Sequence, residues 1–415
     1  MASTTRDTHD VLIVGGSFAG LALSLALARA ECGGPDVMLI ERGPLDDNAE
    51  VRADPRAFAL SAGSRRLLEA IGVWAAVADD AQPVSAIDIT DSALSDVVRP
   101  VLLSYETVAD GEPQMLILPA DRLRGALVRA VRAEPRVAVV APADVAATQI
   151  EPGARTVALR GGAAVAARLL VAADGAASPI RSMADLGVVG GSFRQRGIAA
   201  IVGHENDHAG RAVQHFLPGG PFALLPLRGG RHSCITWSEA EDRAKDIMAL
   251  DDAAFVEQAQ LRAGWRLGAL TLEGGRASWQ LGGHLARRLV APRLALIGDS
   301  IRSVHPIAGQ GVNLGFRDVA ALAEALVEGL RLGLEAGDAT ILSRYERWRR
   351  ADGVQSAAAF AALNALFSND STGVRAIRDI GLGLVDRLPG LKGLLVAEAA
   401  GATGTVPRLL KGQAL

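Results

Sequence analysis

The chain has 415 residues, of which 49% are hydrophobic and 4% aromatic, and its formal net charge is -3. This length allows two or three domains around a large core, and the nearly balanced charge argues against a nucleic-acid-binding protein. The two cysteines, Cys32 and Cys234, belong to no CxxC or Cys/His pattern, so we expect neither a structural disulfide nor a metal site. The sequence shows no signal-peptide pattern and no uncharged apolar run of membrane-spanning length, and we therefore expect a cytoplasmic protein.

Four short apolar runs predict buried strands of a parallel sheet. They are residues 11–14, 37–40, 169–172 and 294–297. An Ala/Leu-rich segment at residues 20–30 predicts a helix between the first two strands, which completes a β-α-β unit. The last three strands run into acidic residues, namely Glu41, Asp174 and Asp299. Acidic residues at the carboxyl edge of a parallel sheet are well placed to bind a ligand.

Other segments have a different pattern. Residues 85–101 and 197–237 look like alternating strands separated by Gly/Pro turns, which predicts an antiparallel sheet inserted into the parallel fold. After Gly311, apolar residues recur at helical spacing as far as Leu330, so a long helix is expected there. The sequence thus predicts an α/β fold class, with a Rossmann-like parallel sheet, an inserted antiparallel β-sheet and a helical C-terminus.

The first strand ends in a glycine-rich turn that matches G-x-G-x-x-G, except that Ser17 replaces the middle glycine. Glycines in such a turn let the backbone approach a pyrophosphate, and the following helix N-terminus offers NH groups and partial positive charge. Glu41 stands where an acidic residue would bind a ribose hydroxyl. The turn therefore predicts dinucleotide binding without distinguishing NAD from FAD. The contacts expected here are Gly15, Gly16, Ser17, Ala19, Gly20, Glu41 and Arg42.

Later segments resemble one family of flavoproteins. Residues 171–181 and 296–300 resemble fingerprints of the aromatic flavoprotein hydroxylases. Residues 305–318, which read His-Pro-Ile-Ala-Gly-Gln-Gly-Val-Asn-Leu-Gly-Phe-Arg-Asp, resemble the hallmark of one branch, the ubiquinone-biosynthesis hydroxylases of the UbiH/UbiF type. Residues 54–61 and 216–227 are also similar to motifs of that branch, so the resemblance spans nearly the whole chain.

The resemblance implies a p-hydroxybenzoate hydroxylase-like fold that binds FAD, non-covalently because no His or Cys stands in a flavin-attachment motif. It implies a discontinuous FAD-binding domain at residues 1–75, 102–184 and 282–345, a substrate-binding β-sheet domain at residues 76–101 and 185–281, and a C-terminal helical region at residues 346–415. The family also has a polar cofactor contact near Ala120, and Asp121 or Arg122 would replace that contact in this chain.

The segment after residue 294 carries a physical argument of its own. Asp299 ends a strand at the ligand edge, where its carboxylate can accept a hydrogen bond from the ribityl chain of FAD. The helix that starts near Val312 would direct its positive end, with the Gly311 NH, at the flavin and stabilise the negative charge of the reduced ring. Pro306 would form a stiff wall beside the ring. The flavin-positioning residues predicted here are Pro306, Gly309, Gln310 and Gly311. The resemblance implies the remaining cofactor contacts, which are Arg56, Arg122, Asp174, Gly175, Val312 and Asn313.

The resemblance implies hydroxylation of an aromatic ring through a flavin C4a-hydroperoxide, with O2 as the oxidant and NAD(P)H or another reductant as the electron donor. The substrate would be a hydrophobic polyprenylated phenol of ubiquinone biosynthesis, and no general base can be named for it. The residues expected to hold this substrate are His215, Phe216, Phe222 and Leu224. Contacts with the inner face of the membrane, with other ubiquinone-biosynthesis proteins and with a second copy of the chain stay open.

Two other functions also stay open at this stage. One is an FAD-dependent reductase of an isoprenoid or quinone-like substrate, which would oxidise NADPH without incorporating oxygen. The other is a non-catalytic FAD-binding scaffold of a biosynthetic complex, which would hold FAD without turnover of any phenol.

Overall fold

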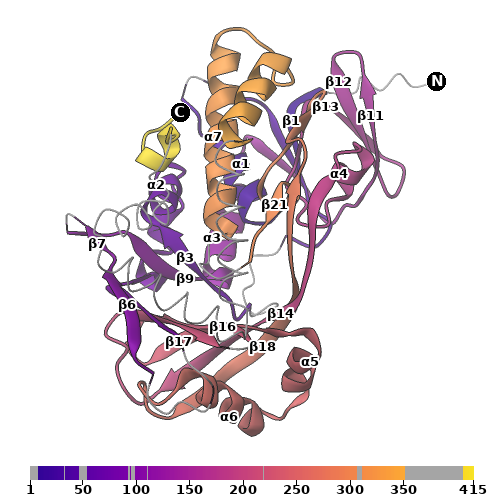
Figure 1. Cartoon of the computed structure of the whole chain (residues 1–415). Helices are drawn as coiled ribbons and strands as arrows, with labels where there is room; N and C mark the ends of the chain where they lie inside the picture. Colours follow the sequence, from indigo (N-terminus) through magenta and orange to yellow (C-terminus); the bar gives the residue numbers. More distant parts are fainter. Residues whose placement is uncertain are drawn as a thin grey trace.

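The computed structural model describes residues 8–31, 33–45, 54–91, 94, 99–109, 111–217, 219–305, 311–350 and 405–415. In Figure 1, helices α1 (Phe18–Ala28) and α7 (Gly311–Arg331) lie beside one sheet in the upper half of the view. Helices α5 (Glu241–Ala249) and α6 (Asp252–Ala263) lie at the lower end, beyond a second sheet. Elements from both ends of the sequence thus share the upper half, and the middle of the chain builds the lower half.

The upper sheet contains the four strands that the apolar runs predict, and the pairings among these strands are parallel. Its parallel strands stand in the order β10 (Val137–Val140), β2 (Val37–Ile40), β1 (Thr8–Val14), β13 (Ala164–Ala172) and β20 (Leu294–Leu296). Two more strands, β12 (Ala154–Leu159) and β11 (Val145–Glu151), extend the sheet in the antiparallel sense. The predicted parallel sheet is confirmed.

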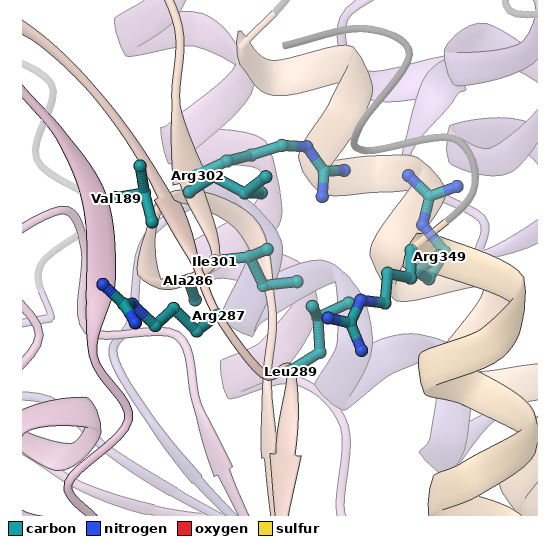
Figure 2. Close-up of a pocket in the computed structure, with 9 residues that line it drawn as sticks. Val189, Ala286, Arg287, Leu289, Ile301, Arg302 and Arg349 are labelled. Atoms are coloured by element: carbon teal, nitrogen blue, oxygen red, sulfur yellow. The ribbon is translucent and has the colours of Figure 1, made fainter. Parts of the chain in front are cut away.

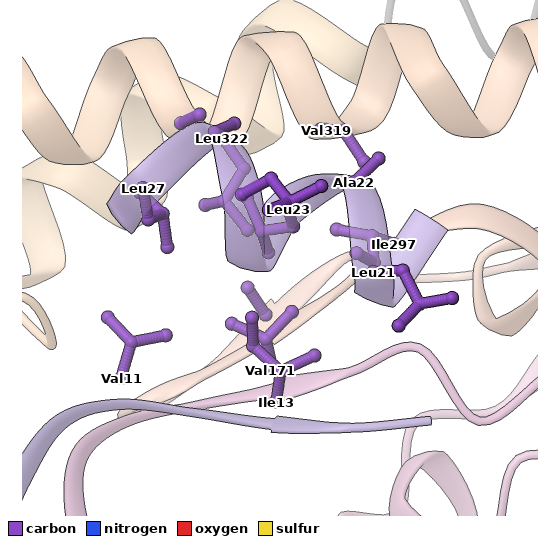
Figure 3. Packing of buried hydrophobic residues seen from close by; sticks show 14 of the residues in the cluster. Val11, Ile13, Leu21, Ala22, Leu23, Leu27, Val171, Ile297, Val319 and Leu322 are labelled. Carbon is purple, nitrogen blue, oxygen red and sulfur yellow. The ribbon is translucent and has the colours of Figure 1, made fainter. Parts of the chain in front are cut away.

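Helix α1 lies between this sheet and α7 because its Ala/Leu-rich sequence offers apolar side chains on all sides. Figure 3 shows Leu23 of α1 in the layer between Ile13 of the sheet and Leu322 of α7. All three side chains are 0% exposed. Burying a leucine side chain contributes roughly 1.5–3 kcal/mol, so this layer fixes α1, and with it the glycine turn at its N-terminus.

The lower sheet is largely antiparallel, as predicted, and among its described strands only β15 and β5 pair in parallel. Its order is β21 (Arg302–Ser303), β18 (Leu270–Ala286), β14 (Val188–His204), β17 (His232–Ala240), β16 (Gly220–Pro226), β15 (Arg211–Leu217), β5 (Ala86–Asp91) and β6 (Val101–Glu106). Strand β6 begins at Val101, so strand pairing carries this sheet past the boundary expected at residue 101. Strand β18 likewise continues to Ala286, past the boundary expected at residue 281.

The two faces of the lower sheet pack against different partners. On one face, Phe222 and Trp237 contact Phe255 and its neighbours on helices α5 and α6. On the other face, Cys234 packs against β3 (Ala57–Ser61) and β9 (Met115–Pro119), which pair with each other and share the core of the upper half through Leu60 and Leu118. The side chains of the second face therefore point toward the upper sheet.

Helix α7 confirms the long helix predicted after Gly311. Residues 339–350 are also helical, whereas residues 351–404, most of the predicted C-terminal helical region, lie outside the described residues. The last described segment contains the short helix η6 (Arg408–Lys411), and the carbonyl of Leu415 accepts a hydrogen bond from the Glu31 NH at 2.8 Å. Within the described ranges, no helix is long and apolar enough to cross a membrane.

Candidate cofactor-binding site

The parallel sheet brings the predicted acidic residues to one edge. Strands β2, β1, β13 and β20 are neighbours that run in the same direction, so their carboxyl ends meet on one side. Glu41 follows β2, the glycine turn follows β1, Asp174 follows β13, and Asp299 follows β20. The edge thus offers acceptor side chains on both sides of a turn that exposes backbone NH groups, an arrangement suited to an extended dinucleotide.

Glu41 has a structural partner in addition to its expected role. One carboxylate oxygen accepts the Gly16 NH at 2.5 Å, and the other accepts the Gly43 NH at 2.9 Å. The side chain therefore ties the end of β2 to the glycine turn. Arg42, the next residue, is exposed to solvent.

The structure shows that glycine is required at position 15 for a different reason from the one that the sequence suggested. Its φ is +114°, and an added Cβ would lie 2.2 Å from the carbonyl oxygen of Ala173 at the end of β13. An added Cβ at Gly20 would lie 1.9 Å from the Gly15 carbonyl oxygen. Both glycines are needed because backbone segments approach closely inside the protein, whether or not a pyrophosphate is bound. Ser17 is the exposed N-cap of α1, and its side chain makes no capping hydrogen bond.

Asp174 offers an unused acceptor at this edge. Its Oδ2 accepts the Ile180 NH at 3.0 Å, whereas its Oδ1 is buried and has no hydrogen-bond partner in the described part of the chain. Burial raises the pKa of the Asp174 carboxyl. A buried acceptor without a donor costs free energy, so this oxygen fits a hydroxyl or NH donor from a ligand such as FAD. Gly175, the next residue, has a φ of +86°, and an added Cβ would meet no atom within 4 Å.

Asp299 lies in a concave part of the same edge. Its carboxyl is accessible to solvent, yet protein surrounds it closely enough that desolvation raises its pKa, while Arg302 and Arg56 oppose that rise. The Arg56 guanidinium also forms an ion pair with Asp54, with Nη2 and Oδ2 2.6 Å apart, and lies 5.6 Å from the ring centre of Trp279. Arg56 is thus held between the two sheets near Asp299. Arg122 is exposed, and its Nε is 3.8 Å from a carboxylate oxygen of Asp80.

A buried ion network around Asp318 holds the turn that carries Asp299. The sequence motifs did not indicate this network. Asp318 of α7 is 0% exposed, and its Oδ1 accepts hydrogen bonds from Arg302 at 2.8 Å and from Arg349 at 2.7 Å. Its Oδ2 accepts the Gly298 NH at 3.0 Å, one residue before Asp299. The available signal was an aspartate on the apolar face of a long predicted helix, because such a residue must find buried partners.

The first turn of α7 is anchored beside this edge. The side chain of Asn313 donates to the Ala59 carbonyl at 2.8 Å and accepts the Ser61 NH at 3.0 Å, so its amide positions the helix against β3. Gly311 is exposed at the start of α7, and an added Cβ there would meet no atom of the described residues within 4 Å. Val312 is partly buried against the core. The predicted residues Pro306, Gly309 and Gln310 lie outside the described residues.

The predicted substrate residues separate onto two faces of the lower sheet. Phe222 is 0% and Leu224 3% exposed, and both pack in the core that faces helices α5 and α6. His215 shares that face, since its ring contacts Phe222 and its Nδ1 lies 2.6 Å from Thr90 Oγ1. These three residues do not face the cofactor side, because side chains alternate along a strand and only Phe216 points the other way.

Two buried histidines predict a loss of stability in acid. Burial lowers the pKa of both His215 and His305 to about 4, whereas an unfolded histidine has a pKa near 6.5. Between these values the unfolded chain binds more protons, so stability falls as the pH drops from 6.5 toward 4, by up to roughly 3 kcal/mol per histidine.

Chemical denaturation at pH 7 and pH 5 measures this effect. We expect the His215→Asn variant to lose less stability on acidification than the parent chain. The matched control is Gln214→Asn, because Gln214 is the neighbour of His215 on β15 and carries no ionisable side chain, so its replacement should leave the pH dependence unchanged. Equal pH dependence in all three proteins would show that His215 is not neutral in the folded state.

Comparisons with known proteins agree with this geometry. A sequence family described as "FAD binding domain" matches residues 8–360. The chain is 37% identical over 406 residues to "Ubiquinone hydroxylase UbiL" of Rhodospirillum rubrum, covering 97% of this chain and 92% of the relative. It is 32% identical over 406 residues to "3-demethoxyubiquinol 3-hydroxylase" of Escherichia coli, covering 96% and 100%.

A solved structure shows the same fold. The p-nitrophenol 4-monooxygenase PnpA of Pseudomonas putida superposes with a TM-score of 0.78 and 19% sequence identity, covering 96% of this chain and 99% of that one. The residues at the carboxyl edge also fit FAD, through the unused Asp174 oxygen and the open Gly311. The chain therefore belongs to the FAD-binding monooxygenase family of the ubiquinone-biosynthesis hydroxylases, with the fold of the aromatic flavoprotein hydroxylases.

Proposed function

We propose that this enzyme hydroxylates the aromatic ring of a polyprenylated phenol in ubiquinone biosynthesis, using O2 and NAD(P)H or another reductant. The observation that carries the proposal is full-length similarity to two relatives named as ubiquinone-pathway hydroxylases. FAD, when bound, supplies the activation of oxygen and the transfer of one oxygen atom to the ring.

The described residues support defined roles around the cofactor. We assign the pyrophosphate to the backbone NH groups of residues 17–20, because the Gly15 and Gly16 NH groups already donate within the protein. We assign the adenosine ribose to Glu41 and the ribityl chain to Asp299. Asp174 supplies the unused acceptor between them. The first NH groups of α7 lack partners within the helix, and they would stabilise negative charge on the reduced ring.

The wall that excludes water from the substrate is proposed on the cofactor-facing side of the lower sheet. Phe216 lies on that side by strand alternation. Trp279 lies there as well, because it contacts Arg56, and an added Cβ at Gly197 would stand 2.7 Å from its ring. These two side chains replace Phe222, Leu224 and His215 as the proposed substrate contacts. No general base is assigned.

The experiment that tests this function uses purified protein carrying FAD, a short-chain prenylated phenol, NADPH and ¹⁸O2. We expect yellow protein whose flavin is released by acid, together with one ¹⁸O atom in each product molecule. NADPH consumption with a reduced, unlabelled product would support the reductase instead. Bound FAD without turnover of any phenol would support the scaffold. A deletion strain that accumulates one quinone precursor would identify the ring position.

A substitution at Gly311 tests the proposal that the N-terminus of α7 stabilises the reduced flavin ring. Gly311→Val should keep FAD bound but lower the flavin reduction potential, because the added side chain would separate the first helical NH groups from the ring. Hydroxylation should fall at least about tenfold, which corresponds to ~1.4 kcal/mol. A dye-coupled redox titration and FAD occupancy measure both effects.

The matched control is Gly275→Val. An added Cβ at Gly275 also meets no atom within 4 Å, but this residue lies on β18, remote from the parallel-sheet edge. We expect an unchanged potential in this variant. An unchanged potential and full activity in Gly311→Val would remove α7 from the flavin site and leave it a structural helix.

The chemistry of the proposed substrate suggests which other partners the enzyme has. A polyprenylated phenol is extracted from a membrane, so we propose that the enzyme works in the cytoplasm at the inner membrane face. Contacts with other enzymes of the pathway and with a second copy of the chain belong to the same proposal. Flotation with vesicles and size-exclusion chromatography measure these contacts, and recovery of all the protein as a monomer away from the vesicles would contradict them.

A further inference from the structure

A separate cavity of about 490 Å³ lies between the strands that join the two sheets and the helical residues 339–350. Figure 2 shows its lining, with Arg287 on one side, Arg349 on the other, and Leu289 and Ile301 between them. None of the sequence motifs led to this cavity, and it includes no residue assigned above to FAD or substrate. Its volume is in the range of small-molecule sites.

The lining combines an apolar floor with an excess of positive charge. Four arginines line the cavity, and its described lining contains no carboxylate. They are Arg287, Arg302, Arg349 and Arg350. Asp318 neutralises part of this charge from behind the cavity, and the nearby Glu346 accepts the Leu289 NH at 2.9 Å. Arg302 also acts on the carboxyl of Asp299, so within the described part of the chain four guanidinium groups face three nearby carboxylates.

Arg302 is the residue that indicates a ligand. Its side chain is only 2% exposed, and its Nη2 donates to Asp318. Its Nε and Nη1 are buried and have no hydrogen-bond partner among the described residues. Buried guanidinium NH groups without acceptors cost free energy, and a charged oxygen of an anion is a strong acceptor for such a donor.

Arg302 and Arg349 are buried, whereas Arg287 and Arg350 are exposed to solvent. The two exposed arginines line the cavity from different elements, since Arg287 follows β18 and Arg350 lies at the end of helical residues 339–350. An anion that enters the cavity would therefore meet exposed guanidinium groups first and the buried Arg302 last. Such an arrangement favours a ligand with several anionic oxygens over a neutral apolar one.

We propose that this cavity binds the phosphate group of a small amphipathic molecule, whose apolar part would lie on Ile301 and on Leu285, which also lines the cavity. A phosphate oxygen would accept a hydrogen bond from the free Nη1 of Arg302, with Arg287 and Arg350 adding attraction as exposed charges. The site also adjoins the cofactor edge, because Asp318 contacts both Arg302 and the Gly298 NH. Both an alkyl phosphate and a dinucleotide carry the required chemistry.

The test is isothermal titration of the FAD-loaded enzyme with inorganic pyrophosphate, decyl phosphate and NADPH. We expect saturable binding that weakens as salt is added, with decyl phosphate tighter than pyrophosphate because of the apolar floor. If NADPH binds most tightly, the phosphate belongs to a dinucleotide. If decyl phosphate does, it belongs to an apolar phosphate ester.

Two variants and a matched control locate the binding. Arg287→Ser and Arg350→Ser should each weaken binding by about fivefold, as expected for removal of one partly exposed charge contact. Arg288→Ser is the control, because Arg288 is the exposed neighbour of Arg287 but does not line the cavity. No saturable binding of any probe, or an equal loss in the Arg288→Ser variant, would overturn the proposal. Flavin absorbance and hydroxylation, measured in the same variants, test the proposed function separately.

Discussion

Replacing Asp299 by alanine is expected to weaken FAD binding by at least about tenfold. Asp299 ends the β20 segment at the ligand edge, and its carboxyl lies in a concave region where desolvation raises its pKa. Hydrogen bonds to charged groups contribute about 1.5–3 kcal/mol, which corresponds to roughly ten- to hundredfold in affinity. Asp299→Asn keeps one acceptor oxygen and should lose less affinity than Asp299→Ala.

The affinity is measured by titrating apoprotein with FAD and following flavin fluorescence. Asp338→Ala is the control, since Asp338 accepts the Thr340 NH at 2.7 Å at the start of helical residues 339–350. Its loss should cost about 1 kcal/mol of stability and leave FAD affinity unchanged. Equal FAD affinity in the Asp299→Ala and Asp338→Ala variants would refute the ribityl assignment.

Replacing Asp318 by alanine is expected to have the largest effect on stability. The substitution leaves Arg302 and Arg349 as buried charges without their shared carboxylate, and their side chains are 2% and 0% exposed. Removing one member of a buried ion network commonly costs about 3–5 kcal/mol. The Gly298 NH would also lose its acceptor, so the Asp299 turn should loosen and FAD affinity should fall together with stability.

Chemical denaturation of the apoprotein measures the free energy of unfolding without the contribution of bound FAD. The control is Asp144→Ala, which removes a solvent-exposed ion pair with Arg160, with Nε and Oδ2 2.6 Å apart. Exposed pairs contribute at most about 1 kcal/mol, so the control should remain nearly as stable as the parent chain. A loss of stability in Asp318→Ala no larger than that of the control would show that the network does not hold the turn.

The cofactor edge could be predicted because its signals are local. Val11 to Val14 form a short apolar run, and a buried parallel strand must be apolar on both faces. The acids Glu41, Asp174 and Asp299 each follow such a run, and all parallel strands end at the same edge. The spacing of glycines in residues 15–20 likewise reports a local backbone requirement.

The orientation of the two faces of the lower sheet could not be predicted in the same way. Alternation along β15 and β16 separates Phe216 from His215 and Phe222 from Ala223, but it does not say which set faces the cofactor. That choice depends on helices α5 and α6, which cover one face, and on β3 and β9, which meet the other. The aromatic residues that seemed suited to a substrate pocket instead fill the core against α5 and α6.

The sequence by itself determined the family, the parallel sheet, the inserted antiparallel sheet and the acidic residues at the carboxyl edge of the parallel sheet. These features could be predicted because strand periodicity and turn formation depend on residues that are neighbours in the sequence. Only the tertiary structure decided which residues meet across long separations. It placed Ala173 against Gly15, set Asp318 under Gly298, and gathered arginines around a cavity between two segments. These contacts depend on how packed layers bring distant segments together, and no local pattern encodes them.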